Sequence, residues 1–401
     1  MFHVEQSFFP CKTAPVCYNE FVPESGQKTR ALHETNKELF MKKSLFHSTG
    51  RFYKANLHMH TTVSDGALTP EEIKAEYQKH GYSILAYSDH EILVPHPELA
   101  DDSFLPLTAI EIELKQPSLA FHDASGEVIP SPPPYLKRNE VYHFVMIAPK
   151  ANETYYPWAT RSYVWGNAKE YIQDYYVGEK PRTFSYENAN AAIKDAKDHG
   201  YLVTYCHPFW SCNHFDTFAG LENVDFVEIF NNSCVHGGYV LDDTDRTMED
   251  FLHLGKHVSP TCSDDCHSMR DLGGGATYIK ADSLSYEDVY RSLKCGDTFA
   301  SKGPEGPVFK DIQFDTETKK LYVESSPVRQ IALTTGVRFA KANGKPFSGT
   351  VDSAEFDLES FIDNFYTYGV PERAYVRLTL TDESGMKAYS RGYFLPELMA
   401  L

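Results

Sequence analysis

The sequence predicts an α/β fold, in which a large layered or barrel-like α/β domain is followed by a smaller all-β domain. Two patterns lead to this prediction. From about residue 53 to about residue 300, short apolar segments alternate with amphipathic helical patterns, which is typical of α/β folds. From Phe309 to Leu401 the helical pattern gives way to alternating polar and apolar residues, which is typical of strands.

The chain of 401 residues exceeds the usual size of one hydrophobic core, so we expect more than one part. Residues 1–50 lack a clear periodicity and are expected to form an N-terminal extension. Residues 51–303 are expected to form the α/β domain and residues 308–401 the β-domain, after a linker rich in Pro and Gly. Two irregular insertions, at about 116–140 and 152–182, are expected to shape the mouth of a site and its specificity.

The start of the first helix is well marked. Thr69 is a natural N-cap, Pro70 suits the first helical position, and Glu72 completes a capping box. The helix should run to about His80, because Gly81 follows.

The other elements repeat one order, in which a short apolar strand is followed by polar residues. Strands over 83–87, 201–205 and 258–262 are followed by His90, His207 and Asp265. The remaining expected elements are a strand over 225–230, a strand over 375–380 and helices over 187–199, 247–254 and 285–294.

Composition excludes some functional classes. Apolar residues make up 42% and aromatic residues 14% of the chain, and no run of about 18 apolar residues is present, so we expect no membrane span. The start of the sequence lacks the pattern of a secretory signal, and the eight cysteines are scattered, so we expect reduced thiols and a cytoplasmic protein. A formal charge of −18 without basic runs argues against nucleic acid as a macromolecular partner.

His58 and His60 are one residue apart on an expected strand, so both imidazoles point the same way and can bind one metal ion. In a chain with 17 histidines such a pair is weak evidence alone. Further imidazoles and carboxylates recur beside other apolar segments, at Asp65, His90, Glu111, His143, His207, Asp265 and His267. Each has a simpler structural explanation singly, but placing so many charges at successive strand ends is costly unless they coordinate something.

These motifs, in this order, resemble the polymerase and histidinol phosphatase (PHP) superfamily. The similarity covers roughly residues 53–300 and rests on His58-Met59-His60, Asp65-Gly66, Ser88-Asp89-His90, Ile110-Glu111, His143, Cys206-His207-Pro208 and Ser263-Asp264-Asp265-Cys266-His267. It implies a distorted seven-stranded β/α barrel with metal ions at the carboxyl ends of the strands. The end of the chain also looks like the tail of carbaryl-hydrolase-like members of that superfamily.

The resemblance implies a polynuclear centre of two or three divalent ions. A first ion would be bound by His58, His60, Glu111 and Asp265, and Glu111 would bridge to a second ion bound by His143 and His207. Asp65, His90 and His267 would bind a third ion, or would bind substrate and move protons, so the expected catalytic residues are Asp65, His90, Asp265 and His267. Glu113 is an alternative to Glu111, and Asp89 and Asp264 are expected to orient imidazoles.

Two ions that share a carboxylate lower the pKa of a bridging water, which supplies a hydroxide for hydrolysis near neutral pH. Imidazole and carboxylate ligands without thiolate suit zinc, manganese or iron. Arg270 and Lys302 are candidates for contact with a substrate phosphate. Glu228 is expected either to form structural hydrogen bonds or to contact substrate, and Trp210 either to line the pocket or to pack.

The sequence therefore predicts a metal-dependent phosphoesterase acting on a small phosphorylated metabolite or nucleotide. A carboxylester, carbamate or amide hydrolase on the same site is the alternative. Urease-like amidohydrolases also begin with His-x-His, but usually end in a lone Asp, whereas this chain ends in Asp265-x-His267. A third possibility is a non-catalytic module that binds metal for stability, which loss of turnover without loss of fold in Asp265→Asn would exclude.

Overall fold

The computed structural model describes residues 42–115, 121–122, 125, 128–129, 140–173, 178–237, 245–345 and 348–401. Most of the predicted N-terminal extension and most of the 116–140 insertion lie outside the described residues. Two of the insertion's described segments, β5 (Phe121–His122) and β6 (Val128–Ile129), pair with each other.

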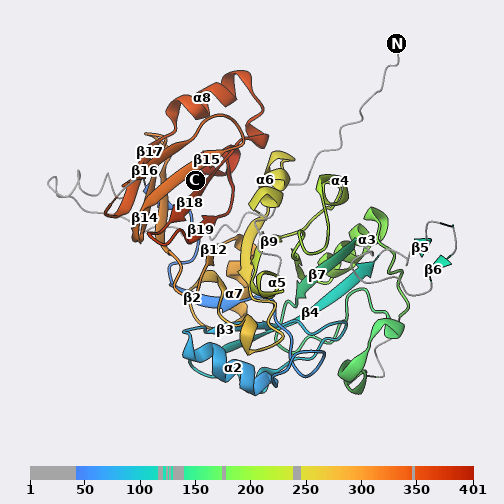
Figure 1. The fold of residues 1–401 in the computed structure, drawn as a ribbon. Coiled ribbons are helices and arrows are strands. Elements are labelled where there is room, and N and C mark those ends of the chain that lie inside the picture. The colour runs from blue at the N-terminus through green and yellow to red at the C-terminus, as the bar shows by residue number, and fades with distance from the viewer. Residues whose placement is uncertain are drawn as a thin grey trace, which may run out of the picture. The chain divides into compact units, whose positions relative to one another are not determined.

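One mixed sheet contains fourteen of the strands in the described residues (Figure 1). Seven neighbouring strands begin its order: β10 (Ser259–Ser263), β9 (Phe226–Asn231), β8 (Leu202–Tyr205), β7 (Val141–Ile147), β4 (Leu105–Lys115), β3 (Ile84–Tyr87) and β2 (Arg51–Asn56). Neighbours in this run are parallel, except that β7 is antiparallel to both β4 and β8. A parallel bridge between Met59 and Cys266 joins the chain that follows β2 to the chain that follows β10, so the two ends of the run also meet.

Two strands of this run, β3 and β7, form where the sequence is largely apolar. Every residue of β3 and of β7 is buried. Such strands are covered on both faces, which explains why they read as apolar runs without alternation.

Three of the predicted helices end close to where their caps predict. Helix α2 (Pro70–Lys79) has Thr69 as N-cap and the complete capping box with Glu72, and it lies below β2 and β3 in Figure 1. Helix α3 (Tyr186–Asp198) begins after Ser185, whose side chain accepts a hydrogen bond from the backbone of Asn188. Helix α7 (Tyr286–Cys295) ends at Gly296, which adopts a left-handed φ of 72° as helix-ending glycines often do.

Several other helical segments are shorter. They are α4 (Phe215–Phe218), α5 (Asn232–His236), α6 (Asp245–His253), and the 3₁₀ turns η1 (Pro97–Leu99), η3 (Arg161–Tyr163), η4 (Gly166–Tyr171), η5 (Met269–Asp271) and η6 (Pro371–Arg373). Among the described residues no helix is both long and apolar enough to cross a bilayer.

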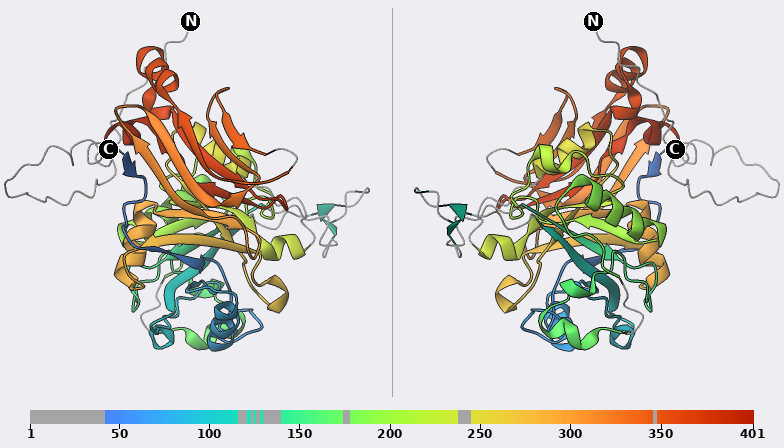
Figure 2. Two further views of the ribbon diagram at one scale, coloured as in Figure 1. Left: turned by 90° about the vertical axis from the view of Figure 1, so that its left-hand side faces the viewer. Right: turned by 90° about the vertical axis from the view of Figure 1, so that its right-hand side faces the viewer.

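The sheet continues beyond β2 into the C-terminal part of the chain, with antiparallel pairing throughout. These strands are β11 (Gly275–Ala281), β12 (Thr298–Lys302), β19 (Lys387–Ser390), β18 (Tyr375–Thr381), β15 (Gln330–Thr335) and β16 (Lys341–Gly344), with β20 (Tyr393–Phe394) paired to β18. A second sheet has the order β1 (Lys42–Ser44), β13 (Phe309–Asp315), β14 (Lys320–Val328) and β17 (Val351–Asp357). The orange and red strands of Figure 2 belong to this part of the chain.

The division of the chain at residues 303–308 stays a prediction, and the hydrogen bonding of the sheet crosses it. Strand β12, inside the predicted α/β domain, pairs with β19, inside the predicted β-domain. Strand β1, inside the predicted N-terminal extension, pairs with β13.

The prediction that the C-terminal part is all-β is wrong, because it contains α8 (Glu359–Tyr368) and α9 (Leu395–Met399). Phe361, Ile362 and Phe365 recur at helical spacing in α8, and all three pack against the apolar core of the C-terminal strands. This pattern of positions 1, 2 and 5 was the sequence signal for a helix.

Candidate metal centre

The chain that follows β2 carries two imidazoles into the centre. His58 and His60 flank Met59, whose bridge to Cys266 ties this segment to the chain beyond β10. Backbone hydrogen bonds run from His60 N to Cys266 O over 3.0 Å and from Asp265 N to His58 O over 2.9 Å. The two segments that carry the first and last predicted ligands are therefore held side by side.

Four buried donor groups converge at a first position. His60 Nε2 lies 3.3 Å from His58 Nε2 and 2.9 Å from Asp265 Oδ1. Glu111 completes the group, with Oε1 3.3 Å from His58 Nε2 and Oε2 3.3 Å from His60 Nε2. Donors around a tetrahedral ion with bonds of about 2.0–2.1 Å are separated by roughly 3.3 Å, so these separations suit one bound metal ion.

Glu111 also reaches the second predicted group. Its Oε1 lies 2.8 Å from His143 Nδ1 and 3.4 Å from His207 Nε2. His143 lies near the start of β7, and not after an apolar segment as the sequence suggested. Because β7 is antiparallel to β4 and β8, its beginning lies at the same edge of the sheet as the ends of the parallel strands.

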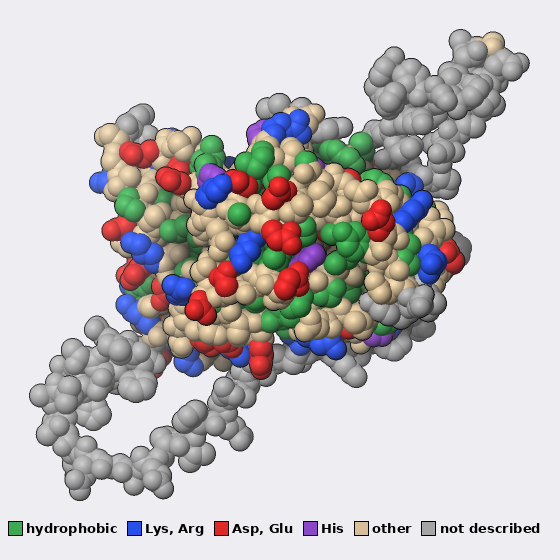
Figure 3. All heavy atoms as spheres, turned by 90° about the horizontal axis from the view of Figure 1, so that it is seen from below, with side chains coloured by type: hydrophobic (Ala, Val, Ile, Leu, Met, Phe, Trp, Pro, Cys, Tyr) green, Lys and Arg blue, Asp and Glu red, His purple; other side chains and the backbone are tan. Residues whose placement is uncertain are grey.

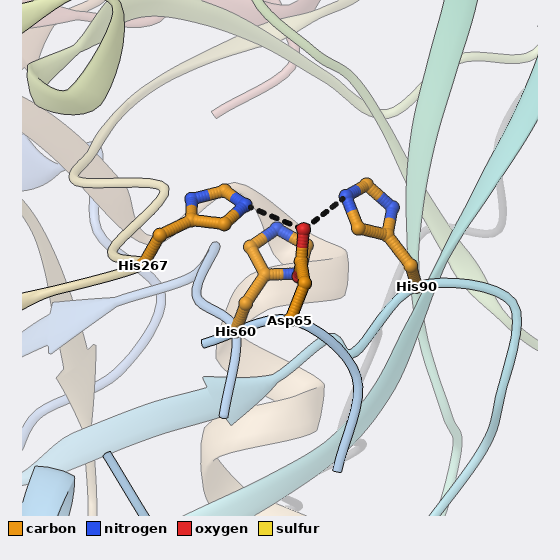
Figure 4. Close-up of side chains that lie close together, drawn as sticks. All are labelled: His60, Asp65, His90 and His267. Atoms are coloured by element: carbon orange, nitrogen blue, oxygen red, sulfur yellow. Dashed lines mark ion pairs between the residues drawn. The ribbon is translucent and has the colours of Figure 1, made fainter. Parts of the chain in front are cut away.

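The third predicted group surrounds Asp65 (Figure 4). Asp65 Oδ2 lies 3.4 Å from His267 Nε2 and 3.9 Å from His90 Nε2, and Asp65 Oδ1 lies 3.7 Å from His60 Nδ1. His60, Asp65, His90 and His267 together form a cluster with metal-binding geometry, so the structure adds His60 to the group. The other nitrogen of His90, Nδ1, lies 3.0 Å from Glu111 Oε2, which makes Glu111 a neighbour of all three groups.

The alternative that Glu113 is the shared carboxylate does not fit this geometry. Glu113 is paired across the strands with His143, and its Oε2 lies 3.5 Å from His143 Nε2. It contacts this single imidazole and its side chain is 26% exposed, whereas Glu111 is 1% exposed and touches five imidazoles.

Buried polar atoms at the centre have no hydrogen-bond partner among the described residues. They are His60 Nδ1, Glu111 Oε2, His143 Nε2 and Asp265 Oδ1. A buried polar atom without a partner costs free energy, and four in one cluster indicate that something absent from the polypeptide satisfies them. Imidazole nitrogens and carboxylate oxygens are donors that zinc, manganese and iron accept, so the residues fit bound divalent ions.

The pKa values show what charge the cluster favours. Burial alone would raise the pKa of Glu111, but the charges of His143, His58 and His90 hold it well below its usual value. Burial would lower the pKa of His60, but the neighbouring carboxylates of Asp265 and Glu111 raise that pKa to about 10. The carboxylates thus remain ionised and the surroundings favour added positive charge, which divalent ions supply.

Hydrogen bonds outside the cluster orient three of its imidazoles. Glu228 Oε1 lies 3.0 Å from His58 Nδ1, and Glu228 Oε2 accepts a hydrogen bond from His207 N over 2.9 Å. Ser211 Oγ lies 3.1 Å from His207 Nδ1, and His267 Nδ1 lies 2.8 Å from the carbonyl of Asp265. Of the two roles that the sequence left open for Glu228, the structure shows the hydrogen-bonding one.

The expectation that Asp89 and Asp264 orient imidazoles is wrong, because both carboxylates bind backbone instead. Asp89 accepts hydrogen bonds from the backbone and side chains of Thr61 and Ser64, and so fixes the loop before Asp65. Asp264 accepts hydrogen bonds from the backbone N–H groups of residues 273–275 and from the Tyr77 hydroxyl. Both loops contain backbone N–H groups that need a hydrogen-bond acceptor, and a buried carboxylate supplies it in each loop.

Left-handed backbone conformations recur at the centre. Glu91, which follows His90, has a φ of 60°, His207 has a φ of 25° and Asp265 has a φ of 49°. Such values are uncommon for residues other than glycine and persist where the surrounding structure imposes them. Three of the ligand-bearing segments therefore turn sharply at the point where they present their side chains.

A cavity of about 390 Å³ opens onto the centre. Its lining contains ligand candidates from all three groups together with Glu91, Glu113, Lys115, Tyr163, Trp165 and Trp210. Tyr163 and Trp165 belong to the 152–182 insertion, which therefore does contribute to the mouth of the site. Of the two roles that the sequence left open for Trp210, the structure shows that it lines the cavity.

The structure does not bring Arg270 and Lys302 to this cavity. The Arg270 side chain is 64% exposed and its Nε donates to Asp271 over 3.0 Å, while Lys302 lies 3.7 Å from Asp245. Lys115 was not predicted from the sequence, but it lines the cavity, and its Nζ lies 2.6 Å from Glu113 Oε1. The signal was strand alternation, which places residues 111, 113 and 115 on one face of β4.

No family profile and no curated protein sequence matches the chain. Solved structures do match. A two-domain protein from Bacteroides vulgatus, described as containing a predicted PHP-like metal-dependent phosphoesterase, is 14% identical, and the match covers 86% of this chain and 96% of that one at a TM-score of 0.38.

The chain is structurally similar to PHP-like metal-dependent phosphoesterases. A protein from Bifidobacterium adolescentis described as a candidate metal-dependent phosphoesterase is 14% identical over 60% of this chain and 95% of that one, with a TM-score of 0.35. A lesion-specific endonuclease from Pyrococcus furiosus is 15% identical over 61% of this chain and 56% of that one, with a TM-score of 0.32. The reaction is therefore inferred from the side chains of the centre.

Proposed function

We propose that this protein is a metal-dependent phosphoesterase that hydrolyses a small phosphorylated metabolite or nucleotide. One observation carries the proposal: Glu111, buried and ionised, lies within 3.4 Å of imidazoles from all three donor groups. A carboxylate shared in this way holds metal ions close together, as centres that hydrolyse phosphate esters require.

The donor groups suggest how the ions are divided. The first ion would be bound by His58, His60 and Asp265, and the second by His143 and His207, with Glu111 shared between them. A third would be bound by the group of Figure 4. The donor set suits zinc, manganese or iron.

We also propose that the seven strands from β2 to β10 form a distorted barrel. The parallel bridge between Met59 and Cys266 supports this, because it joins the two ends of the run beyond the last paired residues. A barrel would place all three donor groups at one rim.

Bound divalent ions would supply positive charge for the phosphoryl oxygens and would make a bound water more acidic. The side chains of the polypeptide contact the substrate and transfer protons. Where the third position holds no ion, His90 and His267, the more exposed imidazoles of that group at 15% and 31%, can contact substrate and transfer a proton to the leaving oxygen. Lys115 lines the cavity and is placed to pair with an anionic oxygen of the substrate.

A small substrate is favoured over a nucleic-acid chain. The cavity volume of about 390 Å³ suits a small molecule. The net charge is −18, and on the face shown in Figure 3 Lys and Arg side chains are scattered among Asp and Glu. Strong binding to a polyanion needs clustered positive charge.

A carboxylester, carbamate or amide hydrolase is the second candidate, and the lining of the cavity supports it. Among the described residues that line the cavity, Lys115 is the single Lys or Arg, and Glu113 neutralises it. A neutral ester would need no further cation.

Elemental analysis of the purified protein, followed by assays of the same sample, tests the proposal. The assays use p-nitrophenyl phosphate, bis-p-nitrophenyl phosphate and p-nitrophenyl acetate, with and without a chelator. We expect two or three of Zn, Mn and Fe per chain and phosphate release that the chelator abolishes. Selective cleavage of the acetate would support the second candidate, and a folded protein that takes up no metal would exclude both.

The Asp265→Asn variant separates an enzyme from a module that binds metal for stability alone. We expect turnover to fall by at least about 100-fold while the metal-loaded protein keeps its fold, because the other donors still bind the ions. Asp198→Asn, at a 56% exposed side chain paired with Lys194, is the matched control and should retain full activity. Loss of thermal stability in Asp265→Asn before any loss of turnover would indicate a structural metal site.

A further inference from the structure

Two of the three tryptophans of the chain lie exposed at the cavity. Trp165 is 47% exposed and Trp210 is 38% exposed, and both line the cavity beside the metal centre. The third, Trp158, is 7% exposed, belongs to the core, and donates from Nε1 to the Pro181 carbonyl over 2.9 Å. Exposure of large apolar rings to water costs free energy. Two such rings at one polar cavity therefore indicate that a ligand covers them.

Trp165 is held beside the third donor group. Its ring centroid lies 6.0 Å from that of His90. A hydrogen bond two residues further along fixes the segment that carries Trp165: Asn167 Nδ2 donates to the Thr62 carbonyl over 3.2 Å. Gly166 adopts a φ of 56°, which turns the chain directly after the indole.

Trp210 is held beside the second donor group. Its ring centroid lies 5.0 Å from that of His207 and 5.6 Å from that of His143. The turn that carries it is closed by backbone hydrogen bonds from Ser211 to His207 and from Cys212 to Phe209, over 3.1 Å and 3.0 Å. The indole is therefore positioned by the same turn that presents His207.

We propose that these two indoles form a subsite for an aromatic or heteroaromatic ring in the substrate, adjacent to its scissile ester. The inference rests on the proposed hydrolase function and names the substrate class within it. Both indole faces are flat and π-rich, and both lie beside imidazoles that would bind the metal ions. A flat ring gains stacking as well as apolar burial on such surfaces, while a puckered ring of equal size gains burial alone. An aryl group and a nucleobase share this chemistry.

The kinetic test compares two substrates matched in size and in leaving-group basicity, benzyl phosphate and cyclohexylmethyl phosphate. We expect kcat/KM to favour benzyl phosphate by roughly 3- to 10-fold in the wild type. The preference should disappear in Trp165→Ala or Trp210→Ala, while cyclohexylmethyl phosphate is still cleaved. Tyr368→Ala, at an 86% exposed aromatic residue outside the cavity, should keep the preference. Adenosine monophosphate against ribose 5-phosphate then distinguishes a nucleobase from a simple aryl group.

Binding gives a readout that needs no turnover. 4-Nitrobenzylphosphonate should quench the fluorescence of the two cavity indoles and leave that of Trp158, and the quenching should be lost in the double variant Trp165→Ala/Trp210→Ala. Equal kcat/KM values for the matched pair, a preference that survives both substitutions, or the absence of quenching would overturn the subsite. If no phosphate ester is cleaved, the proposed phosphoesterase fails, and the quenching experiment still decides the subsite on its own.

Discussion

Glu228 Oε1 lies 3.0 Å from Nδ1 of His58, deep in the protein, where both side chains are at most 1% exposed. This contact leaves Nε2 as the nitrogen of His58 that faces Glu111 and Asp265. The same carboxylate accepts the backbone N–H of His207. Glu228 therefore positions candidate ligands of the first and second donor groups together.

Replacing Glu228 by Gln should weaken metal binding by about 10- to 100-fold, because a carboxylate partner fixes the ring orientation and raises the basicity of a ligating imidazole. Competition with a chelating dye, monitored for each metal, measures the effect. The matched control is Glu222→Gln at an exposed position shortly before the same strand. Unchanged affinity in Glu228→Gln would show that the other contacts suffice to hold His58.

Lys115→Met should raise KM for phosphate esters by roughly 2- to 10-fold, since the side chain is half-exposed and a typical hydrogen bond contributes about 0.5–1.5 kcal/mol. KM for a neutral ester such as p-nitrophenyl acetate should stay the same. Lys150→Met is the control, at a 66% exposed lysine that also lies near a glutamate. An equal change for charged and neutral substrates would mean that Lys115 acts by packing against Tyr163 and not by its charge.

Asp264→Asn should destabilise the fold by about 2–4 kcal/mol, because it removes a carboxyl acceptor from three backbone N–H groups, two of them buried. Tyr77→Phe removes one hydrogen bond to the same carboxylate and should cost about 1 kcal/mol. Urea unfolding of the metal-free variants measures both. A larger loss for Tyr77→Phe than for Asp264→Asn would contradict the view that Asp264 organises the loop of residues 273–275.

The contact between His47 and Asp297 should make stability depend on pH. The hydrogen bond to Asp297 raises the pKa of His47 although burial and Arg391 oppose the rise, and Glu397 adds to it. A pKa raised on folding gives stability that is complete below the unfolded value, about 6.5, and is lost as pH rises through the folded value. The melting temperature of His47→Gln should therefore lie below that of the wild type at pH 5.5 and approach it at pH 8.5. A constant difference across this range would show that the imidazole contributes without its charge.

Much of the site was predictable because ligand chemistry leaves a residue-type pattern in the sequence. Imidazoles and carboxylates at His58, His60, Glu111 and Asp265 follow apolar segments, and the structure brings them within hydrogen-bonding distances of one another. The start of α2 was equally predictable, because Thr69, Pro70 and Glu72 act on adjacent backbone groups. Each of these patterns is recognised from residues that are neighbours in the sequence.

The parts that were missed depend on contacts between distant segments. Asp264 and Asp89 look like partners of neighbouring imidazoles in the sequence, but their hydrogen-bond donors are backbone N–H groups 9 to 11 and 25 to 28 residues away. Arg270 follows a ligand closely, yet its turn directs it outward, whereas Lys115 reaches the cavity from the far end of a long strand. Helix α8 was overlooked because its few apolar positions lie within an otherwise strand-like region.

Strand β12 is hydrogen-bonded to β11 on one side and to β19 on the other, and the predicted linker at 303–308 follows it directly. A fragment ending at the linker would leave one side of β12 with a row of unsatisfied backbone groups, which is a template for intermolecular pairing. Residues 42–303 expressed alone should consequently self-associate, and adding residues 308–401 as a separate polypeptide should suppress this. The C-terminal strands thus protect the edge of β12 from pairing with other molecules.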